Sequence, residues 1–70
     1  MNDAILVIWD TRTLSYLVKT ARLDKRGRPL HRTQHCGSAE EAAAVALDFR
    51  RKAWPLQLRI VAPANVKRRL

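Results

Sequence analysis

The sequence predicts a small α+β domain in which one helix packs on one face of a mostly antiparallel sheet. Three patterns predict it: a continuous apolar run at Ala4–Trp9, a helix-start signature at Ser38, and alternating apolar residues over Leu56–Val61. Seventy residues suffice for one domain with a modest core. We expect residues 1–63 to form that domain, in the order β-β-β-α-β, and residues 64–70 to be a frayed basic tail.

The first predicted strand is Ala4–Trp9, because its run of β-branched residues is typical of a strand buried on both faces. A single helix can cover only one face of the sheet. We therefore expect a second copy of the chain, in a homodimer, to cover the other face. Trp9 is expected to pack in the core. Polar residues 10–13 suit a turn.

Residues 14–23 fit two patterns, a strand and a helix. In the helical pattern an apolar stripe with i, i+3, i+4, i+7 spacing follows Thr13 as N-cap: Leu14, Leu17, Val18 and Ala21. The turn Asp24–Gly27 favours the strand, since a type I turn followed by glycine is a frequent hairpin connection. Pro29 lacks a donor N–H, so the next strand is expected to begin near Leu30 or to lie at a sheet edge.

The clearest element is a helix that begins after Ser38. Ser38 and Glu41 form a capping box, in which the serine hydroxyl accepts from the Glu41 amide and the glutamate reaches back to the serine amide. The helix is expected to end before Pro55. Its core stripe comprises Ala42, Val45, Ala46, Phe49 and Ala53. In the strand that follows, Leu56, Leu58 and Ile60 are expected to face inward.

The charge of the chain indicates a polyanionic partner. Fourteen Lys and Arg stand against six Asp and Glu, for a formal net charge of +8, and most of the cations are arginine. So much like charge opposes compact folding, but it favours binding to nucleic acid through counterion release. Arginine also binds phosphate more specifically than lysine does.

The only cysteine, Cys36, allows no intramolecular disulfide, and the run Ala4–Trp9 is too short to span a bilayer and lacks the flanks of a signal peptide. We therefore expect a cytoplasmic protein that does not associate with membranes.

The basic cluster around the predicted hairpin is the main functional signal. A two-stranded ribbon is narrow enough for the DNA major groove, where arginine can bond to phosphate or guanine. DNA is favoured over RNA. The predicted nucleic-acid contacts are Lys19, Arg22, Lys25, Arg26, Arg28 and Arg32. Flanking charge is expected from Arg50, Arg51, Lys52 and from Lys67, Arg68 and Arg69.

The segments Tyr16–Lys19, Asp24–Gly27 and Gly37–Ala42 resemble the arm-type N-terminal DNA-binding domains of phage and transposon tyrosine recombinases. The resemblance covers about residues 15–53. It implies a sheet that enters the major groove, with base or phosphate contacts at Arg22, Arg28 and Arg32. It also suggests an accessory or regulatory protein of a phage or other mobile element. The chain departs from that family in its apolar first strand and its strand after the helix.

A second interpretation is a protein–protein interaction module. The element order and the Gly-Ser-Ala-Glu-Glu-Ala helix start are similar to the truncated ribonuclease-H-like domains of HicB-type antitoxins, which bind a toxin. A host-protein inhibitor belongs to the same class. Leu47 and Trp54 would then form the partner interface on the helix flank, because aromatic residues anchor interfaces, together with the open sheet face.

We expect no enzymatic activity, no cofactor and no metal. A nuclease of the ribonuclease H type needs converging carboxylates, and only Asp10 with Glu40 or Glu41 is suitably positioned, because the last strand carries no acid. For zinc, Cys36 points away from His31 and His35 on a strand, and a fourth ligand is not evident.

Overall fold

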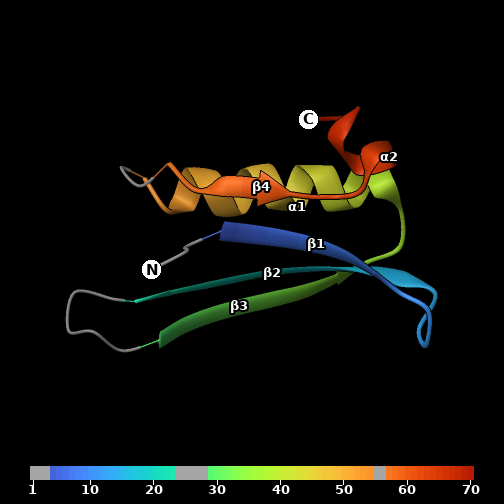
Figure 1. The fold of residues 1–70 in the computed structure, drawn as a ribbon, viewed down its shortest axis with the longest axis horizontal. Coiled ribbons are helices and arrows are strands. Elements are labelled where there is room, and N and C mark those ends of the chain that lie inside the picture. The colour runs from blue at the N-terminus through green and yellow to red at the C-terminus, as the bar shows by residue number, and fades with distance from the viewer. Residues whose placement is uncertain (1–3, 24–28, 55–56) are drawn as a thin grey trace.

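The fold is a four-stranded sheet with two helices, seen in a computed structural model (Figure 1). The structure describes residues 4–23, 29–54 and 57–70, and the side chains of residues 21–32 lie outside that description. The elements are β1 (Ala4–Asp10), β2 (Ser15–Leu23), β3 (Pro29–Cys36), α1 (Ala39–Lys52), β4 (Arg59–Val61) and α2 (Ala64–Lys67). The α+β fold class predicted from the sequence is confirmed.

The sheet is mixed, with strand order β3-β2-β1-β4. β1 pairs antiparallel with β2, β2 pairs antiparallel with β3, and β1 pairs parallel with β4. β3 and β4 therefore run in the same direction on opposite edges, and α1 is the crossover that joins them, as parallel strands require. Figure 1 shows α1 lying along one side of the sheet.

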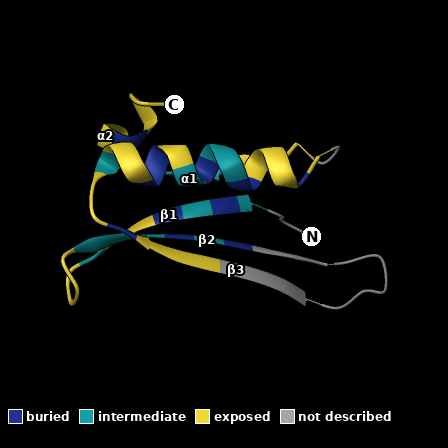
Figure 2. Cartoon of the chain, turned by 180° about the vertical axis from the view of Figure 1, so that it is seen from behind, coloured by how far each residue is buried: buried dark blue, intermediate teal, exposed yellow. Residues whose placement is uncertain are grey.

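The core lies between α1 and the sheet (Figure 2). Ile5 and Val7 on β1 alternate with more exposed neighbours, so one face of the strand is buried. On α1, Ala42 and Ala46 are fully buried and Phe49 is 8 % exposed. The predicted helix stripe is thus confirmed. Small alanine side chains let the helix approach the sheet closely. Burying an alanine also costs no side-chain conformational entropy.

Residues 15–23 form a strand, so the helical alternative for this segment is wrong. Val18 pairs with Val7 on one side and with Gln34 on the other. The ladder with β3 continues to the pair Leu23 and Pro29. Pro29 is the first residue of an edge strand, where a missing N–H is tolerated. The predicted turn Asp24–Gly27 lies outside the described residues.

Two sequence predictions about single elements need correction. β4 comprises only Arg59–Val61, although the inward Leu58 and Ile60 pack against the core as predicted. Trp9 is 44 % exposed rather than buried, and it packs edge-on against Tyr16, with ring centroids 4.8 Å apart. The turn after β1 brings Leu14 to a φ of 52°, a left-handed conformation costly for a bulky residue.

Residues 64–70 are not a frayed tail. Ala64–Lys67 form α2, which follows Pro63 and packs on α1. Val66 is fully buried, and the Asn65 side-chain amide donates a hydrogen bond to the Tyr16 hydroxyl. A buried valine and a tertiary hydrogen bond explain why this basic segment is ordered. No helix among the described residues is long and apolar enough to cross a membrane.

Candidate nucleic-acid interface

The basic residues predicted to act together lie at two opposite ends of the molecule. In Figure 1 the end of β2, the start of β3 and the last turn of α1 lie at one end, here called the ribbon end. α2, the β1–β2 turn and the first turn of α1 lie at the other, here called the α2 end. Arg50–Lys52 belong to the ribbon end, whereas Lys67–Arg69 belong to the α2 end. The predicted flanking charge is therefore divided.

The β2–β3 ribbon extends beyond the rest of the sheet. Among the residues that the structure describes, β1 pairs with β2 as far as Ala21, whereas β2 and β3 remain paired to Leu23 and Pro29. Arg22 is paired with Leu30 in this ladder. Arg32 is the register partner of Thr20. The predicted contacts Lys25, Arg26 and Arg28 lie outside the described residues.

Lys19 lies away from the ribbon end. It stands in the middle of β2, between Leu6 on β1 and Thr33 on β3, and it is partly buried. A cation at this position is flanked by strands on both sides, so it cannot extend past the ribbon as a tip residue would. Lys19 therefore lies inside the sheet, next to the ladder pair of Thr20 and Arg32.

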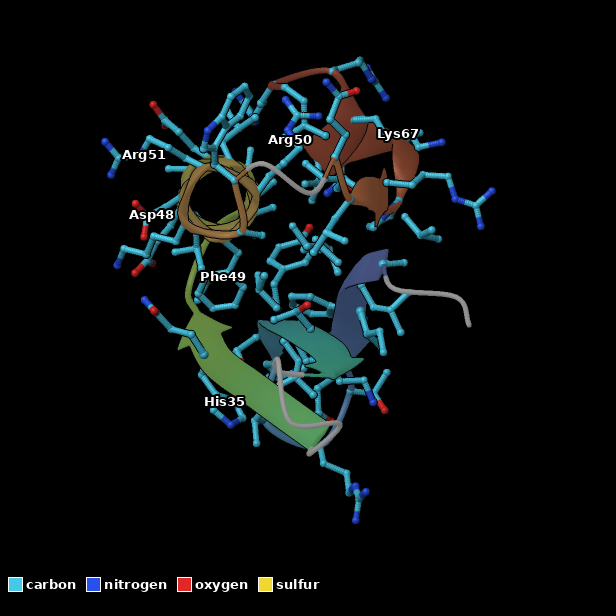
Figure 3. The ribbon with its side chains drawn as sticks, turned by 90° about the vertical axis from the view of Figure 1, so that its left-hand side faces the viewer. His35, Asp48, Phe49, Arg50, Arg51 and Lys67 are labelled. Atoms are coloured by element: carbon cyan, nitrogen blue, oxygen red, sulfur yellow. The ribbon has the colours of Figure 1, made fainter. Side chains whose placement is uncertain are left out.

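The last turn of α1 carries three cations and one acid. Asp48 accepts from the Arg51 guanidinium at 2.6 Å and lies 3.0 Å from the Lys52 ammonium. These two bonds lower the pKa of the Asp48 carboxyl below its usual value, with the Arg51 bond the larger cause. Figure 3 shows Arg50 leaving α1 on the other side from Arg51 and Asp48. Asp48 thus offsets part of the positive charge here, an i, i+3 and i, i+4 pattern readable from the sequence.

The first turn of α1 carries the opposite charge, at the α2 end. The Ser38 hydroxyl accepts from the Glu41 amide at 3.1 Å, as the capping box predicts. The Glu41 carboxylate, however, accepts from the Gly37 amide at 3.0 Å rather than from Ser38. Glu40 is exposed beside it. The two acids suit the positive end of the helix dipole and offset part of the positive charge that Lys67–Arg69 bring to this end.

A hollow of about 540 Å³ opens beside the last turns of α1. It is lined by Leu47, Arg50, Arg51, Trp54, Gln57 and Leu58. Trp54 is 78 % exposed, whereas Leu58 is 6 % exposed and joins the core. Leu47 and Trp54, predicted as a partner interface, therefore line the same hollow. Gln57 and Leu58 were missed, because only the fold brings the segment before β4 against α1.

The face of the sheet turned away from α1 is open and largely apolar. Ile8 is 42 % exposed, Val61 is 40 % exposed, and Leu6 and Leu17 are partly buried. Ile8 pairs with Leu17, and Leu6 pairs with Val61, so the four side chains form one apolar patch across β2, β1 and β4. His35 projects from β3 on this side (Figure 3).

Two of the candidate residues for nuclease chemistry, Asp10 and Glu41, accept hydrogen bonds from backbone amides, and the side chain of His31 lies outside the described residues. Asp10 accepts from the Arg12 amide at 2.9 Å, and this bond is the main reason that the pKa of its carboxyl is lowered. Cys36 is buried while its neighbour His35 is exposed. Across residues 4–23, 29–54 and 57–70, no three His, Cys, Asp or Glu side chains are grouped to bind a metal ion.

Comparisons with protein-family models, with curated proteins and with solved structures give no match. The function is therefore inferred from the residues of this chain.

Proposed function

We propose that this protein binds nucleic acid, with DNA favoured over RNA, as a non-catalytic accessory or regulatory factor, and that the ribbon end is its contact surface. The observation that carries the proposal is the β2–β3 ribbon, which extends past β1 toward the same end of the molecule as Arg50–Lys52. A ribbon of this kind fits the major groove, with positive charge on the neighbouring helix to contact phosphates.

The sequence of the ribbon supports this choice of end. Arg22, Lys25, Arg26, Arg28 and Arg32 stand in or beside the segment that joins β2 to β3, against one acid, Asp24. Such a concentration of arginine on a chain of formal charge +8 favours phosphate binding by counterion release. The resemblance to the arm-type domains of tyrosine recombinases points to the same strands.

The ribbon end suits DNA better than the open face of the sheet does. On that face Lys19 and Arg59 stand beside four apolar residues, Leu6, Ile8, Leu17 and Val61, and these apolar side chains do not replace the water and ions around phosphates. We therefore propose that the ribbon enters the groove by its end, while Arg50 contacts the backbone beside it. In the recombinase family, by contrast, the sheet as a whole enters the groove.

A salt titration with matched double variants tests this proposal. Affinity for a fluorescein-labelled DNA duplex is measured by anisotropy at increasing salt concentration. We expect log affinity to fall linearly with log salt, and Arg26→Ala/Arg28→Ala to make that slope shallower by about 2, since each lost phosphate contact removes roughly 0.9. The control is Arg68→Ala/Arg69→Ala, with the same charge change at the α2 end, which should leave the slope as in the wild type.

Two results would contradict the proposal. If the wild-type protein does not bind DNA at low salt, it is not a DNA-binding protein. If both double variants change the slope equally, net charge rather than the ribbon end governs binding. Circular dichroism of each variant shows whether it is folded.

The open face supports a second proposal, self-association or binding of a protein partner. Ile8 and Val61 are each at least 40 % exposed within one apolar patch, and such patches mark protein interaction sites. A homodimer would bury this patch, and an antitoxin-like or inhibitory role would bury it against another protein. Sedimentation at micromolar concentration tests the dimer: wild type should sediment as a dimer and Ile8→Lys as a monomer. A wild-type monomer would exclude the homodimer.

A further inference from the structure

The hollow beside α1 has a composition that neither the ribbon nor the open face shares. Leu47, Arg50, Arg51 and Trp54 are spaced i, i+3, i+4 and i+7, so they form one stripe of the helix and its last turn. The Trp54 amide donates to the Arg51 carbonyl at 3.2 Å, which fixes the backbone that carries the indole. Leu47, Arg50 and Arg51 thus lie on α1, and Trp54 lies two residues past its last residue, Lys52.

The hollow combines an apolar floor, a flat aromatic face and two cations. Leu58 is buried at its base, while Trp54 leaves 78 % of its surface in water. An indole so exposed contributes little to the core, and aromatic residues are costly to leave in water without a partner. The hollow's volume of about 540 Å³ falls in the range of about 300–1,000 Å³ typical of small-ligand sites.

The two guanidiniums select an anionic ligand. Arg51 is oriented by its 2.6 Å bond to Asp48, and a guanidinium has enough donors to bind that carboxylate and a phosphate together. The Arg50 side chain diverges from those of Arg51 and Asp48 as it leaves α1 (Figure 3), and among the described residues it forms no ion pair. A ligand seated on Trp54 would therefore meet a cation on each side.

We propose that this hollow is a stacking site for an unpaired base of single-stranded nucleic acid. The base stacks on the Trp54 indole, and its neighbouring phosphates bind Arg50 and Arg51. Single-stranded nucleic acid alternates flat aromatic bases with phosphates. The indole of the hollow complements the bases, and its two guanidiniums complement the phosphates. A duplex hides the faces of its bases, so it would not use Trp54. The inference rests on the proposed function, and it adds a preference for unpaired strands at this position.

Tryptophan fluorescence gives a direct test. The chain has two tryptophans, so Trp9→Phe leaves Trp54 as the single reporter. We expect a ten-nucleotide thymidine oligomer to quench the Trp54 emission, and an abasic deoxyribose-phosphate oligomer of the same length and charge to leave it unchanged. In anisotropy titrations Trp54→Ala should weaken thymidine-oligomer binding by roughly 5- to 150-fold, the loss typical of one stacked base.

Matched controls separate this inference from the proposed function. Trp54→Ala should bind the abasic oligomer and a DNA duplex as the wild type does, and Trp54→Phe should retain part of the stacking. If Trp54→Ala binds the thymidine oligomer unchanged, the stacking site is wrong while duplex binding at the ribbon end can still hold. If Trp54→Ala instead changes only the sedimentation of the protein, the hollow is a protein contact and the inference is overturned. Absence of binding to every nucleic acid would contradict both proposals.

Discussion

The two ends of the molecule differ in how many of their side chains are buried or hydrogen-bonded within the fold. At the α2 end, Val66 is fully buried, Asn65 bonds to Tyr16, and Ser38 caps α1. At the ribbon end, the hairpin extends beyond β1 and Trp54 is exposed beside Arg50 and Arg51. The α2 end therefore holds interactions that stabilise the fold, whereas the ribbon end presents the groups for which we propose nucleic-acid contacts.

Cations therefore stand in different surroundings at the two ends. Lys67, Arg68 and Arg69 follow a segment that is held by burial, whereas Arg50 and Arg51 line a hollow. Substitutions at the α2 end should thus change stability, and substitutions at the ribbon end should change binding. Four substitutions, at Val66, Ser38, Asp48 and Cys36, test this contrast between stability and binding.

The largest expected effect on stability comes from Val66. Val66→Ala removes methyl groups from a fully buried position and should lower the free energy of unfolding by about 1.5–3 kcal/mol. Trp54→Ala at the ribbon end should change it by less than about 0.5 kcal/mol, because that side chain is mostly in water. Urea unfolding measures both. A larger loss for Trp54→Ala than for Val66→Ala would reverse the comparison.

The cap of α1 should have the next largest effect. Ser38→Ala removes the acceptor for the Glu41 amide and should lower the free energy of unfolding by about 1 kcal/mol. Ser38→Asp keeps a side-chain acceptor at the same position and should retain most of the stability. Chemical denaturation of the three proteins is the measurement. Equal midpoints for Ser38→Ala and wild type would show that the cap contributes nothing.

Releasing the cations at the ribbon end should alter binding rather than stability. Asp48→Asn removes the partner of Arg51 and Lys52, so the slope of log affinity for DNA against log salt should steepen by up to about 1. Glu40→Gln makes the same change in net charge at the α2 end and should leave the slope unchanged. An equal response to the two variants would show that total charge alone matters.

The smallest expected effect is alkaline destabilisation through Cys36. Burial, followed by the nearby Glu41 charge, raises the pKa of the Cys36 thiol above its usual value. The unfolded thiol therefore loses its proton first, so the free energy of unfolding should fall as pH rises above about 9, until the folded thiol also ionises. Cys36→Ala should show a shallower decline between pH 8 and 10.5 in urea titrations. Parallel pH profiles would contradict it.

The helix and the strands could be predicted where local pattern and burial agree. The capping residues at Ser38–Glu41 and the stripe ending at Ala53 depend on contacts within one or two turns, so the sequence contains the whole signal. Residues 15–23 were ambiguous, because the same apolar residues satisfy both periodicities. Pairing with β1 and β3 decided in favour of the strand.

The candidate site could be predicted only in part. Leu47 and Trp54 were identified from helical spacing, and the cations of α1 and the basic ribbon were identified from the distribution of charge along the chain. The opposite locations of Arg50–Lys52 and Lys67–Arg69 could not be predicted, because distance along the chain does not give distance across the fold. The ordering of residues 64–67 also escaped prediction, since one buried valine gives no periodic signal.

The net charge, the capped helix and the apolar first strand could be read from the sequence alone, because each depends on composition or on neighbours along the chain. The tertiary structure alone decided that β4 pairs parallel with β1, that one face of the sheet is open, and that Trp54 shares a hollow with Gln57 and Leu58. The physical reason is that these features depend on which surfaces the crossover through α1 brings together. The spacing of apolar residues along one strand or helix does not specify which surfaces that crossover brings together.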